Sequence, residues 1–107
     1  MANPFATISI VSGTTQAVVA AVPNRKIRVL NYTLISDTAG TYKFQSASTD
    51  ITGAIPVAAN GGASPNGHGA LPDGQIGLFE TAAGEALNLV FSTTANIGGH
   101  LAYQLRP

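Results

Sequence analysis

Short runs of β-branched, aromatic and leucine residues alternate with polar positions along most of this chain. Glycine, proline, asparagine or aspartate interrupts these runs roughly every ten residues, a spacing typical of antiparallel all-β domains. The pattern predicts eight strands, at residues 5–12, 16–22, 26–36, 41–46, 51–59, 75–80, 86–92 and 97–106. Almost no segment has the period of an amphipathic helix. We therefore expect an all-β fold, an antiparallel two-sheet sandwich of jelly-roll type, with residues 1–107 in one domain.

The residues between the strands predict how the strands are joined. Residues 12–13 are Ser-Gly, a pair that favours reversal of the chain, and residues 37–40 form a four-residue turn that predicts a hairpin. Residues 81–85 are expected to join the next two strands as a hairpin, with a single helical turn as the alternative. Pro56 cannot donate a hydrogen bond to a neighbouring strand, so its strand is expected at a sheet edge.

The predicted strand at residues 26–36 is apolar on both faces. Ile27 and Val29 occupy one set of alternating positions, and Leu30 and Leu34 occupy the other. Strands with two apolar faces are usual where helices cover both sides of a sheet, but this sequence predicts no such helices. Three explanations stay open: a bulge that shifts the register, a covering loop, or another subunit.

The low charge of the chain limits the classes of partner. Five basic and five acidic residues give a net charge of zero and a charged fraction of 9%, against about 25% in ordinary soluble domains. We expect no nucleic-acid partner, because phosphate binding needs clustered Lys and Arg. No apolar stretch approaches the roughly 18 residues of a membrane-spanning helix, and residues 1–4 start no basic leader, so we expect no membrane partner. A weakly charged surface is typical of one buried against other copies or a larger scaffold.

The titratable residues form no pattern that predicts catalysis. The chain has no cysteine, which excludes disulfides, thiolate nucleophiles and thiolate metal ligands. His68 and His100 fall short of the three or four ligands of a zinc site. The carboxylates lie in or beside turns, where they bond to the nearby backbone: Asp37, Asp50, Asp73, Glu80 and Glu85. We therefore expect a protein that is not an enzyme and has no metal and no cofactor.

One basic cluster is a candidate for binding a partner. Arg25, Lys26 and Arg28 are close in sequence, and Lys26 and Arg28 fall on the same face of the predicted strand. With Tyr32 they are candidate contacts to an acidic patch on a partner. The alternative is a solvated strand entrance whose charges discourage pairing with other sheet edges.

A second candidate is the long connection at residues 60–74, which is rich in Gly, Asn, Pro and Ser. Connections of this length in compact domains are commonly functional. It contains no aromatic residue that would form a platform for a sugar ring. Its candidate recognition residues are Asn60, Asn66, His68 and Asp73.

Four segments resemble small β-sandwich proteins encoded in many tailed-phage genomes. They are residues 21–30 (AVPNRKIRVL), 56–62 (PVAANGG), 79–89 (FETAAGEALNL) and 98–103 (GGHLAY), and the similarity extends over nearly the whole chain from Ser12. In size and composition the chain is also similar to capsid decoration, or cement, proteins, which are jelly-roll or related β domains.

This resemblance implies a virion protein without enzymatic activity or cofactor. Such a protein binds the major capsid protein on the outer surface of the shell as a homodimer or homotrimer. Separately, Pro4 disfavours regular structure, so residues 1–5 are expected to form either an extended arm that reaches a neighbour or a frayed terminus. The alternatives are a tail- or fibre-associated module that binds a carbohydrate or a receptor, and another virion part such as a head–tail connector accessory.

Overall fold

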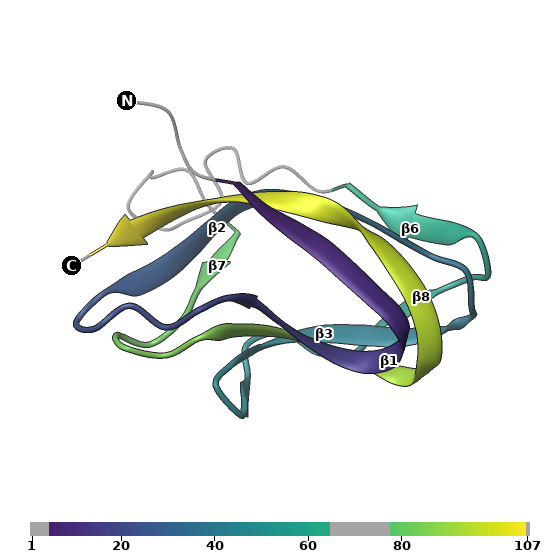
Figure 1. Ribbon diagram of the computed structural model, residues 1–107, viewed down its shortest axis with the longest axis horizontal. Helices are drawn as coiled ribbons and strands as arrows, with labels where there is room; N and C mark the ends of the chain where they lie inside the picture. Colours follow the sequence, from purple (N-terminus) through teal and green to yellow (C-terminus); the bar gives the residue numbers. More distant parts are fainter. Residues whose placement is uncertain (1–4, 65–77, 107) are drawn as a thin grey trace.

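The computed structural model describes residues 5–64 and 78–106, and these residues form strands and turns without a helix (Figure 1). The strands are β1 (Phe5–Val19), β2 (Lys26–Ser36), β3 (Gly40–Ser46), β4 (Thr49–Asp50), β5 (Ile55–Val57), β6 (Gly61–Ala63), β7 (Phe79–Glu80) and β8 (Leu87–Arg106). They pair in antiparallel fashion within one eight-stranded sheet. The prediction of an antiparallel all-β fold is confirmed.

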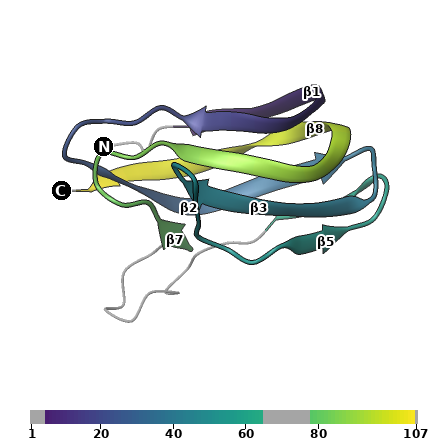
Figure 2. The same cartoon turned by 90° about the horizontal axis from the view of Figure 1, so that it is seen from below.

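Strand β8 is the centre of the sheet. Its residues 87–91 pair with β3 and its residues 97–106 pair with β2, while β1 pairs along its other edge. Figure 1 shows β1 and β8 turning back at the same end of the molecule, so that the sheet folds over on itself. Figure 2 shows the strands side by side from β1 through β8 to β2 and β3. The prediction of two separate strands here is wrong, because Ala95 and Ile97 continue the inward-facing pattern through the bend.

Strand β1 is also longer than predicted, because residues 12–13 bend the chain without reversing it. Ser12 has a φ of 51°, and the register against β8 shifts between Ile10 and Gly13. The Ser12 amide donates to Asn96 Oδ1 at 2.8 Å, which ties the bend of β1 to the bend of β8. A bulge inserts residues into one strand and sharpens its twist, so two predicted strands form one bent strand.

Neither predicted hairpin is present. Strands β2 and β3 do not pair with each other but with successive segments of β8, and β7 pairs with β2. Residues 81–85 form a turn around Gly84, whose φ is 78°, and contain no helical turn. These strands therefore form their hydrogen bonds with strands that are distant in the sequence. By contrast, Pro56 lies in β5, which pairs only with β3 among the described strands, so its predicted edge position is confirmed.

Strand β2 has the predicted bounds, and a bulge explains its two apolar faces. The register against β8 shifts between Val29 and Asn31, so the buried positions change from Ile27 and Val29 to Leu30, Tyr32 and Leu34. The side chain of Ile35 remains 56% exposed. Of the three explanations that the sequence left open, the bulge accounts for most of the pattern.

The core lies between the two halves of the folded sheet and has an aromatic centre. Rings of Tyr32, Tyr42 and Phe44 contact one another with centroids 5.0–6.3 Å apart, and Phe79 packs on Phe44 at 5.1 Å. The hydroxyls of Tyr32 and Tyr42 are hydrogen-bonded at 3.0 Å. Burial raises the pKa of Tyr32, and the bond to Tyr42 raises it further. Tyr32 therefore stays neutral, and its bond to Tyr42 gives both hydroxyls a partner inside the core.

Candidate functional site

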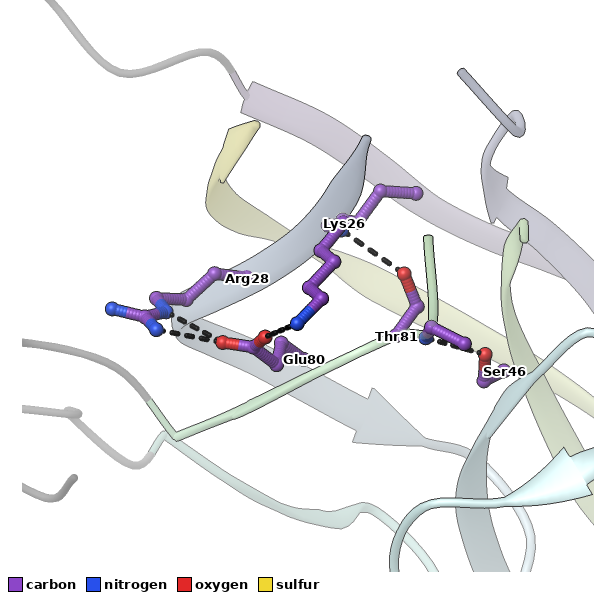
Figure 3. A network of polar contacts seen from close by, with 7 residues as sticks. Lys26, Arg28, Ser46, Glu80 and Thr81 are labelled. Carbon is purple, nitrogen blue, oxygen red and sulfur yellow. Dashed lines mark hydrogen bonds and ion pairs between the residues drawn. The ribbon is translucent and has the colours of Figure 1, made fainter. Parts of the chain in front are cut away.

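The basic cluster (Arg25, Lys26 and Arg28) lies at the start of β2, opposite β7. Arg28 and Glu80 are directly paired across these strands, so their side chains meet. Arg28 donates to Glu80 Oε1 from Nε at 3.0 Å and from Nη2 at 2.7 Å, and Lys26 Nζ lies 3.6 Å from Oε2 (Figure 3). One carboxylate therefore pairs with two cations on the same strand face.

The three basic residues differ in how far a partner can reach them. The side chain of Arg28 is 8% exposed and that of Lys26 is 44% exposed, while Arg25 is exposed in the turn before β2. A buried guanidinium needs a paired anion, because leaving it unpaired costs several kcal/mol. Arg28 therefore has a structural role with Glu80. Arg25 and Lys26 present positive charge to solvent.

The turn after β7 holds this cluster against the rest of the sheet. Thr81 exchanges two hydrogen bonds with Ile27: its amide donates to the Ile27 carbonyl at 2.9 Å, and its Oγ1 accepts from the Ile27 amide at 3.0 Å. The next amide along the chain donates to Ser46 Oγ on β3 at 3.0 Å. The amide of Gly84 donates to the Arg25 carbonyl at 2.9 Å. The backbone beneath the cationic side chains is thus fixed on two sides.

Sequence reasoning grouped Tyr32 with the basic cluster, but the structure places it elsewhere. Its ring is buried in the core, and its hydroxyl bonds to Tyr42. The bulge after Val29 turns the side chain of Tyr32 inward. Sequence reasoning also missed Glu80 as the partner of Arg28. The two are 52 residues apart, so no local spacing signals the pair.

The predicted recognition loop is only partly within the described residues. Asn60 is exposed with a φ of 60°, directly before β6, whose three residues pair with residues 34–36 of β2. The first part of the predicted loop is therefore a short strand. The other candidate residues, Asn66, His68 and Asp73, lie outside the described residues.

Asn60 borders a shallow groove of about 390 Å³ at the folded end of the sheet. The groove is lined by Thr33, Ile35, Ser36, Asp37, Asn60, Asn96, Gly98 and Gly99. Asp37 Oδ1 accepts from the Asn96 amide and Oδ2 from the Asn96 side chain, each at 2.9 Å. Oδ1 also accepts from Thr38 Oγ1 at 2.8 Å. These bonds, the one from the Asn96 backbone first, hold the pKa of Asp37 below its ordinary value.

Most polar side chains that line this groove already have hydrogen-bond partners within the chain. Asn96 uses its amide nitrogen for Asp37 and its Oδ1 for Ser12, so it bridges three segments of the folded end. A recognition site instead keeps a few converging polar groups for its ligand. The arrangement therefore holds the bends of β1 and β8 together.

Within residues 5–64 and 78–106, no three His, Cys, Asp or Glu side chains lie together as metal ligands would. The same residues contain no helix long and apolar enough to cross a membrane. Comparison with protein families, curated proteins and solved structures finds no significant match to this chain.

Proposed function

We propose that this protein is a non-enzymatic structural protein of a tailed-phage virion, a capsid decoration or cement protein. It is synthesised in the host cytoplasm and binds the major capsid protein on the outer surface of the shell, which it stabilises. It acts as a homodimer or homotrimer and needs no cofactor. The proposal includes the jelly-roll-like arrangement of two layers that the resemblance implies.

The observation that supports this proposal is the uneven distribution of charge. Among the described residues, four basic and two acidic side chains lie at the start of β2, in β7 or close to an end of β8. They are Arg25, Lys26, Arg28, Arg106, Glu80 and Glu85. The 15 residues of β1 include no charged side chain. A molecule with one net-positive region and a long uncharged strand elsewhere suits docking of that region on an acidic protein surface.

The exposed members of the basic cluster provide the test. We expect Arg25→Glu combined with Lys26→Glu to lower binding to shells stripped of the protein by at least about tenfold, since each reversal replaces an attraction with a repulsion. The readout is the number of copies bound per major capsid protein, counted by quantitative mass spectrometry. Arg28→Glu is unsuitable, because the side chain of Arg28 is 8% exposed and the variant would bury a second carboxylate against Glu80.

A matched variant separates this effect from a general change of charge. Lys43→Glu changes the net charge as much as Arg25→Glu does, but Lys43 lies on β3, paired with Asp50. We expect Arg25→Glu to weaken docking and Lys43→Glu to leave it unchanged. Equal occupancy for the two variants would contradict docking through the basic cluster.

The second candidate function is a tail- or fibre-associated module that binds a carbohydrate or a receptor. The groove beside Asn60 is the feature that favours it, since it offers amide and hydroxyl groups beside the apolar Ile35. The bonds among Asp37, Asn96 and Ser12 weigh against it. Glycan binding that Asn60→Ala abolishes, together with only a few copies per particle, would replace the decoration proposal with this one.

A further inference from the structure

The outer edge of β1 is the longest unpaired sheet edge among the described residues. β1 spans 15 residues and pairs only with β8 among the described strands, so no described strand lies beside its other edge. An unpaired edge presents backbone N–H and C=O groups that can pair with another chain. Proteins usually protect such edges with charged side chains, proline, short strands, bulges or a covering segment.

The side chains of β1 give its edge little protection. Phe5–Val19 has no charged residue and no proline. Phe5 and Val11 are 74% and 77% exposed, two of the four large apolar side chains that are exposed in the described part of the chain. Bulges between Ile10 and Val19 disturb the second half of β1, whereas the pairing of residues 5–10 with β8 is regular. The first half of β1 is therefore the part most suited to receive another strand.

One side chain covers this regular part. The Ser9 amide donates to Gln16 Oε1 at 2.8 Å, and Gln16 Nε2 donates to the Thr7 carbonyl at 3.1 Å. A carboxamide has the same donor and acceptor as a peptide group. An added strand would form hydrogen bonds with the same two outward-facing groups, the Ser9 amide and the Thr7 carbonyl. Gln16 therefore occupies two of the backbone positions that an added strand would use.

We propose that the segment Thr7–Ser9 of β1 is a strand-docking site for β1 of a second copy, which Gln16 keeps closed within each chain. The neutral side chains of β1 favour this occupant, because two copies of an uncharged strand meet without repulsion and a charged partner would gain nothing there. Pairing of one strand with itself also places the same surface on both partners, as a two-fold axis requires. The inference adds an interface to the homo-oligomer of the proposed function, but its test uses no shell, so it can fail while docking on the shell is unaffected.

The test is removal of the carboxamide. Gln16→Ala frees both backbone groups, and we expect self-association at least about tenfold tighter than in the wild type, since two hydrogen bonds no longer compete with pairing. Sedimentation equilibrium over a series of protein concentrations measures the association constant of the variant relative to that of the wild type. Hydrogen exchange should then show the amides of residues 7–9 protected in the associated form. A cooperative thermal transition confirms that the variant is folded.

Two further variants make the result specific. Gln16→Glu places a charge on the edge, so two copies repel each other, and we expect it to associate no more tightly than the wild type. Gln45→Ala removes a comparable carboxamide from β3, which bonds to Asp50, and should have no effect. The proposal would be overturned if Gln16→Ala associated no more tightly than the wild type. It would also be overturned if Gln16→Glu or Gln45→Ala associated as tightly as Gln16→Ala, or if the amides of residues 7–9 were unprotected in the associated form.

Discussion

Phe91 is a buried side chain that fills space between the two halves of the folded sheet. Its ring is 2% exposed, and its backbone is paired with Tyr42 of β3. Cutting it to alanine leaves a cavity between the two halves of the sheet, so Phe91→Ala should lower the free energy of unfolding by about 3–5 kcal/mol.

Urea unfolding measures this loss. Val11→Ala is the matched control, because Val11 is exposed and its truncation should change stability by less than about 0.5 kcal/mol. A loss for Phe91→Ala below about 1 kcal/mol would mean that Phe91 does not face the core.

The hydrogen bonds of Asp37 make the free energy of unfolding depend on pH. Its bonds to Asn96 and Thr38 favour the charged carboxylate, so the pKa is lower in the folded chain than its ordinary value of 3.8. A depressed carboxyl pKa stabilises the fold above the ordinary value, and this stabilisation is lost as pH falls through the folded pKa. Asp50 acts in the same direction, through Gln45 and Lys43.

We therefore expect the wild type to lose stability between about pH 5 and pH 2, and Asp37→Ala to lose less over the same range. Urea midpoints at several pH values measure the difference. If the two proteins lost the same stability on acidification, Asp37 would not hold the bends in the way described.

At the scale of the element, two neighbouring glycines of β8 have different roles. A Cβ on Gly99 would lie 1.8 Å from the Thr33 carbonyl oxygen, and its φ of 154° disfavours other residues. A Cβ on Gly98 would meet nothing within 4 Å. Gly99→Ala should therefore force β8 away from β2 and destabilise the protein by more than about 2 kcal/mol, while Gly98→Ala is nearly neutral. Thermal unfolding of the two variants tests this contrast, and similar transition temperatures would contradict it.

The elements differ in how far sequence could predict them. The bounds of β2 follow from its apolar run and the flanking turn residues, and its bulge was one of the stated explanations. Residues 12–13 and 93–96 resemble turns in composition, yet they bend β1 and β8 without ending them. The difference lies in partners: each bend is bonded to the other through Ser12 and Asn96, which are 84 residues apart. Local patterns contain no information about such a bond.

The candidate site was predictable to a similar extent. The spacing of Lys26 and Arg28 correctly placed both on one strand face, because this relation depends only on the two-residue period. Their shared partner Glu80 depends on pairing between β2 and β7, and burial of Tyr32 depends on the bulge. Both are decided by tertiary packing.

Over the whole molecule, the basic cluster and the β1 edge are separate surfaces. Within the described part of the chain, no strand pairing joins β1 to β7 or to residues 25–28. Substitutions at distant sites without shared contacts have additive effects. We therefore expect Arg25→Glu to leave the self-association of Gln16→Ala unchanged, as sedimentation would measure. A change of more than about threefold would mean that the two surfaces are coupled.

The central position of β8 also determines when this chain can fold. β1, β2 and β3 precede β8 in the chain, and each finds its main partner in β8. During synthesis these strands leave the ribosome before β8 exists, and their pairing requires closure of long loops, which makes folding slow. Until residues 87–106 emerge, the apolar side chains of β1 have no strand to pack with and are exposed to solvent. Assembly of the sheet is therefore a late and concerted event, and the nascent chain before that point is the form most in need of a chaperone.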